Sequence, residues 1–192
     1  MIEKLINHIQ SITPLTVDEI SVVKELVKVK EIPRKKMLHR AGEVGLYSAF
    51  VVEGCLRSFA IDRDGNEHNL QFAPENWWIA DFQSYIKNRP SVLNIDALLD
   101  SKVLVLSRDC QLSIFDRIPK LERYFRILTE NALAASNYRT IDYLTLTAKN
   151  RYEKFCGLYP TIINTIPQKA IASYIGITPE FLSKLRAERM RA

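Results

Sequence analysis

The sequence predicts an α+β protein in which an N-terminal antiparallel β-roll of the jelly-roll type, with flanking helices, precedes one long helix and a C-terminal helix-turn-helix. Three observations lead to this prediction. Apolar residues recur at every second position in runs between residues 29 and 107, as in strands, with turn residues between the runs. Residues 119–147 have helical spacing without glycine or internal proline. Residues 166–191 have the pattern of two short helices joined by a glycine turn.

The composition is that of a folded protein with a basic C-terminal end. The chain has 192 residues, 47% of them hydrophobic, which is enough apolar material for one large or two small domains. No apolar run approaches the length of about 18 residues that a membrane span needs, and the N-terminus lacks the layout of a signal peptide. We therefore expect a cytoplasmic protein that does not contact membranes. The net charge is +5, and residues 149–191 carry eight basic side chains against three glutamates, which favours a polyanionic partner at this end.

Enzyme, metal and cofactor chemistry find no support in the sequence. Cys55, Cys110 and Cys156 lie far apart without paired spacing, so we expect reduced core cysteines rather than a zinc or iron–sulfur site. The histidines stand in different elements with no ligand pattern around them (His8, His39 and His68). The sequence contains no P-loop, no G-x-G-x-x-G and no recognisable nucleophile motif. We expect no cofactor, no metal and no catalytic residue.

The first two predicted elements are amphipathic helices. Apolar residues follow helical spacing over residues 2–12 and again over residues 17–27, and Thr13-Pro14 interrupts the pattern between them. Thr16, with Glu19 three residues later, predicts a capping box at the start of the second helix.

Alternating runs then predict the strands of the roll. The runs cover residues 29–40, 48–62, 68–73, 92–99 and 102–107. Asp64-Gly65 between two of them is a strong hairpin signal. Short strands separated by glycine turns favour a small antiparallel roll of about seven or eight strands.

The predicted long helix, residues 119–147, is notable for its length. At 1.5 Å per residue it would extend ~40 Å, more than such a small domain needs for its own packing. A dimer interface explains this length, and helix-turn-helix proteins usually bind paired half-sites. The alternative is that the helix packs along its own roll, and the small residues at 132–136 suit either arrangement.

The predicted helix-turn-helix has a start signal, a turn signal and a second start signal. Pro167 can open the first helix, and Gly176 is placed to end it in the left-handed conformation. Thr178 is a good N-cap for the second helix, with Pro179 at its first position. Phe181, Leu182 and Leu185 form an apolar side that can pack back on the first helix.

The outer side of the second helix is polar and mostly basic, which predicts a helix that lies in the DNA major groove. Lys or Arg can donate to guanine, Glu can accept from cytosine and Ser can do either, so Glu180, Ser183, Lys184 and Arg186 are candidate base contacts. Positioning contacts are expected from the helix ends and the remaining basic residue: Gln168, Lys169, Ser173, Thr178 and Arg189. The alternative is a generic helical hairpin with a solvated charged face.

The whole chain resembles the Crp/Fnr family of bacterial transcription regulators. The residues that carry the resemblance are Gly42-Glu43, Gly54, Asp64 with His68, residues 72–78 and, most specifically, residues 166–183. The resemblance implies a cyclic-nucleotide-binding-like sensor roll at 1–118, a dimerisation helix at 119–147 and a DNA-binding domain at 148–192. It also implies a homodimer that binds promoter DNA, responds to a small-molecule effector and has RNA polymerase as a further partner.

The stretch that corresponds to the family's phosphate-binding cassette departs from the family pattern. Members that bind cyclic AMP carry a Gly-Glu pair followed by an adjacent Arg-Ser pair. Here the Gly-Glu is missing, Pro90 separates Arg89 from Ser91, and only Asp81 could replace the glutamate, with a shorter reach. We therefore expect the roll to sense an effector other than cyclic AMP.

Aromatic residues still make a plausible effector pocket in this stretch. Trp77, Trp78, Phe82 and Tyr85 supply large apolar surfaces, as small-molecule sites do, and Asp81, Arg89 and Ser91 supply polar groups. The alternative is that these rings only fill the core.

A second departure concerns the family's β-wing, because residues 151–165 have the pattern of a helix and a turn. Two other functions compete with DNA binding as interpretations of the sequence. One is a small-molecule-binding or interaction module, which the basic last helix disfavours. The other is a cupin-like enzyme, which lacks a two-histidine-plus-carboxylate cluster.

Overall fold

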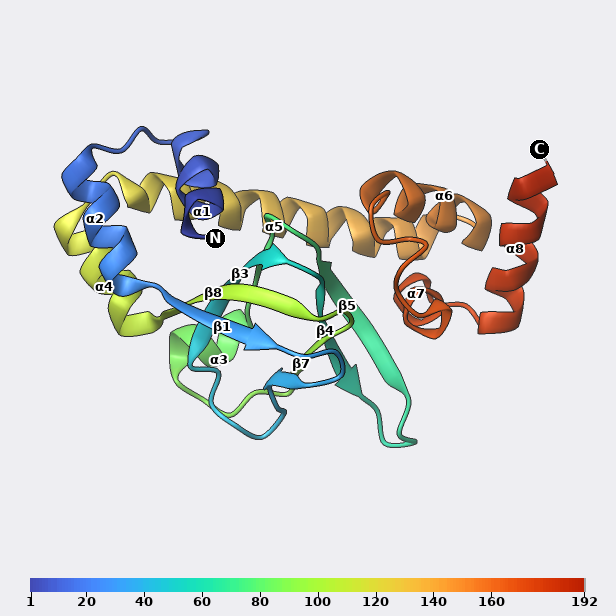
Figure 1. The fold of residues 1–192 in the computed structure, drawn as a ribbon. Coiled ribbons are helices and arrows are strands. Elements are labelled where there is room, and N and C mark those ends of the chain that lie inside the picture. Colours follow the sequence, from blue (N-terminus) through green and yellow to red (C-terminus); the bar gives the residue numbers. More distant parts are fainter. Residues whose placement is uncertain (192) are drawn as a thin grey trace.

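The computed structural model describes residues 1–191 (Figure 1). Its helices are α1 (Ile2–Gln10), α2 (Val17–Leu26), α3 (Phe82–Lys87), α4 (Arg108–Arg117), α5 (Leu121–Thr145), α6 (Ala148–Leu158), α7 (Gln168–Ile175) and α8 (Pro179–Arg191). Its strands are β1 (Lys28–Ile32), β2 (Met37–His39), β3 (Tyr47–Glu53), β4 (Leu56–Ile61), β5 (Glu67–Ala73), β6 (Trp78–Ile79), β7 (Asn94–Ala97) and β8 (Ser101–Ser107). The predicted α+β class and the order of its parts are confirmed.

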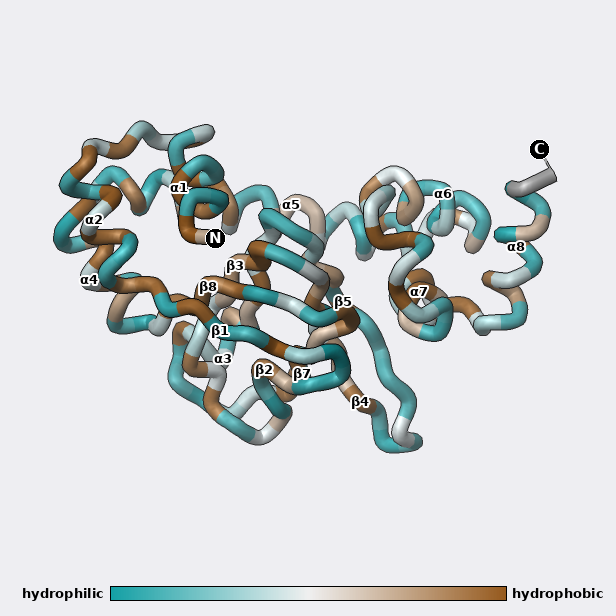
Figure 2. Tube along the Cα trace, in the orientation of Figure 1, coloured by the Kyte–Doolittle hydropathy of each residue, from teal (hydrophilic) through white to brown (hydrophobic). Residues whose placement is uncertain are grey.

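The strands form a roll of two antiparallel four-stranded sheets, with orders β1-β8-β3-β6 and β2-β7-β4-β5. Apolar side chains from both sheets fill the space between them, among them Val51, Leu56, Ile79, Ile95 and Val103. Figure 2 shows hydrophobic residues concentrated in the strands at the centre of the roll, whereas α8 is mostly hydrophilic. The roll therefore has its own core, built from the inward-facing half of each alternating run.

Local chemistry explains two turns of the roll. The predicted strand 29–40 is divided because Pro33 has no N–H to give to a sheet, and β1 ends just before it. The hairpin predicted at Asp64-Gly65 is confirmed between β4 and β5. Its Asp62 carboxylate accepts from the backbone N–H groups of Asp64 and Asn66, each at 2.9 Å. Gly65 has a φ of 83°, which favours glycine there.

Two elements of the roll were not predicted. Strand β6 has two residues and helix α3 has six. Elements of this length are too short for apolar periodicity to identify, and the sequence predicts only a pocket segment in this region.

The N-terminal helices cover one end of the roll. Leu5, Ile6 and Ile9 pack in one buried cluster with Phe50 and Leu104 of the roll, and the first turn of α5 joins the same cluster. The capping box of α2 is confirmed, since Glu19 N–H donates to Thr16 Oγ1 at 3.3 Å and Thr16 N–H donates to the Glu19 carboxylate at 2.7 Å.

Helix α5 spans the molecule from the N-terminal helices to the C-terminal ones (Figure 1). It has 25 residues, and its first turn is buried through Leu121 and Tyr124. From residue 129 to residue 138 every side chain is exposed. The middle of the helix therefore stands free of the roll in this chain, and its predicted pairing in a dimer stays a prediction.

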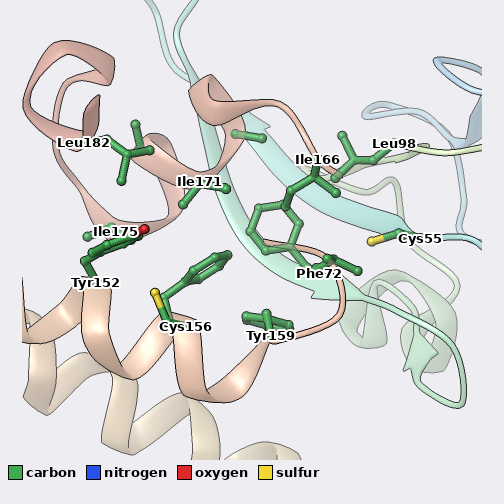
Figure 3. Close-up of a cluster of buried hydrophobic side chains, with 14 of the residues drawn as sticks. Cys55, Phe72, Leu98, Tyr152, Cys156, Tyr159, Ile166, Ile171, Ile175 and Leu182 are labelled. Carbon is green, nitrogen blue, oxygen red and sulfur yellow. The ribbon is translucent and has the colours of Figure 1, made fainter. Parts of the chain in front are cut away.

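The C-terminal helices pack on the roll through one shared core. Figure 3 shows Tyr152 and Cys156 of α6, and Tyr159 just after it, facing side chains of α7 and α8, with Phe72 from β5 in the same cluster. The Phe72 ring lies 5.7 Å from the Tyr159 ring and 5.2 Å from the Tyr174 ring, centroid to centroid. Because the hydrophobic core is continuous across the contact, the helix-turn-helix is docked on the roll rather than tethered to it.

Candidate nucleic-acid interface and roll groove

The α7–α8 turn has the predicted local geometry. Gly176 ends α7 with a φ of 76°, and its N–H and that of Ile177 donate to the Ala172 carbonyl at 2.9 and 3.0 Å. Thr178 then caps α8 by accepting from the Phe181 N–H at 3.2 Å. These bonds satisfy backbone groups at both helix ends, so local sequence fixes how α8 leaves α7. Pro167 differs slightly from the prediction, because it is the N-cap of α7 and the helix starts at the next residue.

Helix α8 has one buried and one exposed side. Leu182 and Leu185 are buried in the shared core, whereas Ser183, Lys184 and Arg189 are exposed. Cationic and hydroxyl groups therefore project from a helix whose backbone is held by apolar packing. This is the arrangement that a helix needs to present donors to base edges and phosphates.

The nine predicted DNA-contacting residues differ in exposure. Seven are exposed, namely Gln168, Lys169, Thr178, Glu180, Ser183, Lys184 and Arg189. Ser173 and Arg186 are half-buried. Arg186 donates to Asn164 Oδ1 at 3.1 Å, which ties α8 to the loop before α7. Ser183 Oγ lies 3.3 Å from Gln168 Oε1, so two predicted contacts are adjacent on the surface.

Ser173 is bound by the roll. Its hydroxyl donates to the Glu67 carbonyl at 2.5 Å and accepts from the Asn69 N–H at 3.0 Å. Both partners belong to β5, an edge strand, and edge strands have backbone groups that no neighbouring strand pairs. Ser173 thus fixes α7 to the sheet, and in this arrangement its hydroxyl is not free for phosphate.

Lys169 lies beside a buried ionic cluster of the roll. It lines a cleft of about 140 Å³ together with Arg57, Glu67 and Asp96. Within this cluster Arg57 Nε and Nη2 donate to the two Asp96 carboxylate oxygens at 2.8 and 3.1 Å, and Nη1 donates to Glu67 at 2.7 Å. Arg57 balances only one of the two carboxylate charges, so the cluster keeps a net negative charge. Lys169 is exposed and forms no ion pair within residues 1–191, so its ammonium group remains available to an external anion.

A long groove of about 1590 Å³ runs between the roll and α5. Its wall contains five of the seven predicted pocket residues, Trp77, Trp78, Asp81, Phe82 and Tyr85, and does not contain Arg89 or Ser91. Trp77 packs toward the C-terminal helices, 5.6 Å from the Tyr159 ring. Trp78 instead donates from Nε1 to the Tyr124 hydroxyl at 2.9 Å and packs on Phe50. The two tryptophans thus also belong to separate apolar clusters, as the core-filling alternative anticipated.

The polar residues of the predicted cassette satisfy one another. Asp81 caps α3 by accepting from the N–H groups of Gln83 and Ser84 at 3.0 and 3.2 Å. Its second carboxylate oxygen accepts from the Ser91 hydroxyl. Arg89 is exposed, and only its carbonyl takes part, accepting from Ser84 Oγ at 2.5 Å. The predicted cassette therefore presents no free carboxylate to the groove, and its one arginine, Arg89, does not line the groove.

Two arginines that matter for these sites were not singled out from the sequence. Arg139 of α5 donates to the Asn69 carbonyl at 2.9 Å and the Tyr174 carbonyl at 3.2 Å, so it links α5, β5 and α7. Arg108, at the start of α4, lines the groove close to Tyr85. Nothing local in the sequence marks either residue, because each acts through chain segments at least 20 positions away.

The described residues offer no other site of an obvious kind. No helix in the range 1–191 is long and apolar enough to cross a membrane. Within the same range, no three His, Cys, Asp or Glu side chains are grouped closely enough to hold a metal ion. The outer face of α8 and the groove are the features that carry a functional argument.

Comparisons with known proteins establish the fold. No protein-family model and no curated protein matches the sequence. FixK2 from Bradyrhizobium japonicum matches with a TM-score of 0.72 at 17% identity, covering 84% of this chain and 83% of that one. The regulator CLP from Xanthomonas campestris, described as c-di-GMP responsive, matches with a TM-score of 0.70 at 11% identity, covering 92% of each chain. A protein from Eubacterium rectale, described as a regulator of the Crp/Fnr family, matches at 0.70 and 14% identity, covering 96% and 88%. The chain therefore has the fold of these proteins, two of which are described as regulators.

Proposed function

We propose that this chain is a sequence-specific DNA-binding transcription regulator of the Crp/Fnr type that places α8 in the major groove. The observation that carries the proposal is the α7–turn–α8 unit, in which a capped helix with a buried apolar side presents exposed Ser183, Lys184 and Arg189. Lys184 and Ser183 lie where side chains can reach base edges, and Arg189 can reach a phosphate. The fold shared with known regulators supports the same function.

The proposed active form is a homodimer that pairs through α5. The exposed middle and end of this helix carry Leu133, Asn137, Ile141 and Leu144 at spacings of four, four and three residues. Leu133 is 62%, Ile141 50% and Leu144 82% exposed, which is unusual for large apolar side chains in one row. Such spacing is that of a two-helix seam, and a single asparagine within it is a known device for fixing register. The sensor roll (1–118), dimerisation helix (119–147) and DNA-binding domain (148–192) are the parts of this proposal.

The roll is the proposed sensor, with an effector other than cyclic AMP. Support comes from the groove between the roll and α5, whose wall is largely apolar and aromatic. The closed Asp81–Ser91 pair leaves no free carboxylate for a ribose hydroxyl at that end.

Binding to DNA from the gene's own upstream region tests the function. We expect a specific shift with the full chain that weakens steeply as salt is raised, because phosphate contacts release counterions. Cyclic AMP should leave the shift unchanged. Binding only in the presence of cyclic AMP would contradict the proposed effector class. Equal affinity for this DNA and for random duplex would contradict sequence-specific recognition.

A further inference from the structure

The groove has one corner in which a charge and a hydroxyl lack the partners that such groups normally have. This corner is formed by Tyr85 of α3, by Arg108 and Gln111 of α4, and by Ser48 of β3. It lies apart from the Asp81–Ser91 pair of the predicted cassette, whose hydrogen bonds are complete. The apolar remainder of the groove, including Trp78 and Ala132, opens from this corner toward α5.

Arg108 differs from the other basic residues of the groove wall in its partners. Its Nη1 donates to the neutral Gln111 side chain at 2.6 Å, and within residues 1–191 no carboxylate forms an ion pair with it. Among the other basic residues of the wall, Arg126 and Lys154 pair with carboxylates. Arg139 and Arg151 each donate to more than one backbone carbonyl, and Arg123 donates to the Ile12 carbonyl. A half-buried guanidinium whose only bond is to an amide retains most of its capacity for an external anion.

Tyr85 supplies the second observation. The side chain is 3% exposed, and within the described residues its hydroxyl forms no hydrogen bond of acceptable geometry, although the Ser48 side chain lies beside it. Burial raises the pKa of this phenol above its ordinary value, so the hydroxyl remains a proton donor. The neighbouring Ser48 hydroxyl donates elsewhere, to the Leu106 carbonyl at 3.4 Å. The Arg108 guanidinium carbon lies 6.0 Å from the centre of the Tyr85 ring, so both donors belong to the same corner.

A buried hydroxyl without a partner is costly, and its cost is removed when a ligand supplies an acceptor. Two donors in one corner, one of them charged, suit a carboxylate, which accepts at both oxygens. The apolar wall beyond them suits a ligand body without many polar groups. A cyclic nucleotide fits this corner poorly, because its ribose hydroxyls would need a free carboxylate that the groove does not offer there.

We propose that the Arg108–Tyr85 corner binds the carboxylate of a small molecule whose apolar body, aromatic or aliphatic, extends along the groove toward Trp78 and α5. This inference rests on the proposed sensor role of the roll and names the chemical class of its effector.

Calorimetric titration of the full chain with carboxylates and their amides tests this inference. The probes are phenylacetate, 3-phenylpropionate and octanoate, each compared with the matching neutral amide. We expect the acids to bind more tightly than the amides, by about ten-fold or more, because the amide cannot form the charge-assisted bond to the guanidinium. Equal affinity of acid and amide would overturn the proposal, and so would the absence of binding by all three acids.

Two arginine variants test whether the acids bind at this corner. Arg108→Gln should reduce the affinity for the acids by about ten-fold or more and leave the affinity for the amides unchanged. Arg117→Gln removes an arginine of the same helix that pairs with Glu25 outside the groove, and it should change neither affinity. If Arg117→Gln weakens acid binding as much as Arg108→Gln does, the assignment to this corner is wrong.

The Tyr85→Phe variant tests whether the Tyr85 hydroxyl binds the ligand or instead stabilises the free protein. Removing a buried hydroxyl that has no partner should raise the melting temperature of the free protein and lower its affinity for the acids several-fold. A lower melting temperature would mean that the hydroxyl has a structural bond, and unchanged acid affinity would remove it from the site. DNA binding is measured separately, so loss of acid binding with intact DNA binding would refute only the ligand class.

Discussion

His8 is the titratable side chain that most directly links the N-terminal helices to α5. Its Nδ1 lies 2.7 Å from the Tyr124 hydroxyl, which in turn accepts from Trp78 Nε1 at 2.9 Å. Since the indole can only donate, the phenol is free to donate its own proton to a neutral imidazole. Burial lowers the pKa of His8 below its ordinary value, which favours the same neutral form.

The hydrogen bonds among His8, Tyr124 and Trp78 predict that the folded protein loses stability as the pH is lowered. A histidine with a lowered pKa in the folded state stabilises the fold fully above its ordinary pKa of about 6.5, and this contribution is lost as the pH falls through the lower folded value. We expect His8→Asn, which keeps an acceptor but cannot titrate here, to lose less melting temperature than wild type as the pH is lowered from neutral to below the ordinary histidine pKa of about 6.5. Parallel losses in both proteins would show that His8 does not contribute.

Lys184 and Lys169 are predicted to have different roles in DNA binding. Lys184→Ala should cost ~1–3 kcal/mol on the specific site and relax the preference at one base pair. Lys169→Ala should weaken specific and random DNA alike, because a phosphate contact carries no sequence information. Affinities of both variants for both DNAs test this, with Lys24→Ala, a lysine that pairs with Glu3 on the N-terminal helices, as the control. Equal losses on both DNAs for Lys184→Ala would reject its role in base recognition.

At the scale of elements, the end of α7 is held between its own turn and α5. Gly176 has a positive φ, and a Cβ at this position would overlap the Tyr143 ring of α5. Arg139 adds to the same contact by packing over the Tyr174 ring, 3.9 Å from its centre. The direction in which the chain enters α8 therefore depends on Gly176, because a larger residue would not fit there without a shift of Tyr143.

Two glycine substitutions are predicted to have opposite effects. Gly176→Ala should destabilise the protein by more than ~1 kcal/mol, because it combines an unfavourable left-handed conformation with an overlap on Tyr143. Gly157→Ala, within α6 and with open space around the added methyl group, should stabilise it by up to ~1 kcal/mol. Urea denaturation of the two variants measures both values. A neutral Gly176→Ala would mean that the turn is not held as described.

The same elements show what the sequence could predict. The Thr16 and Thr178 caps, the Asp64-Gly65 hairpin and Gly176 depend on neighbours within a few residues, and each was predicted correctly. The docking of Ser173 on β5 joins residues 104 and 106 positions apart, and no local pattern records such a pairing. Trp77 and Trp78 illustrate the same limit, because the cluster that each ring enters is set by residues distant in the sequence. Trp77 packs on Tyr159, whereas Trp78 contacts Tyr124 and Phe50.

At the scale of the whole molecule, docking uses α7 and leaves the outer face of α8 open. Ser173 and the shared core hold the C-terminal helices against the roll, and Lys184 and Arg189 of α8 remain exposed. Helix α8 lies at the opposite end of the molecule from α1 and α2 (Figure 1). The groove lies between the roll and α5, and α5 also carries the exposed apolar row. An effector in the groove would therefore contact the helix that we propose to form the dimer.

The dimer proposal predicts the mass of the protein in solution. Wild type should elute at twice the chain mass of 22.1 kDa. Leu144→Glu should shift it to the monomer, because a charge would be buried in the helix seam. Light scattering after size exclusion measures both, with Leu112→Glu as the control, an exposed leucine of α4 outside that row. A monomeric wild type, or a dimer that survives Leu144→Glu, would contradict pairing through α5.

Selection of binding sites from a random duplex pool tests the central claim most directly. A dimer with one recognition helix on each chain predicts an inverted repeat whose half-sites are centred about one helical turn, ~10 base pairs, or a multiple of it apart. Enrichment of such a repeat by wild type, lost with Lys184→Ala at one position of each half-site, is the expected result. Recovery of unenriched DNA, or of a single unrepeated half-site, would contradict a dimeric sequence-specific regulator.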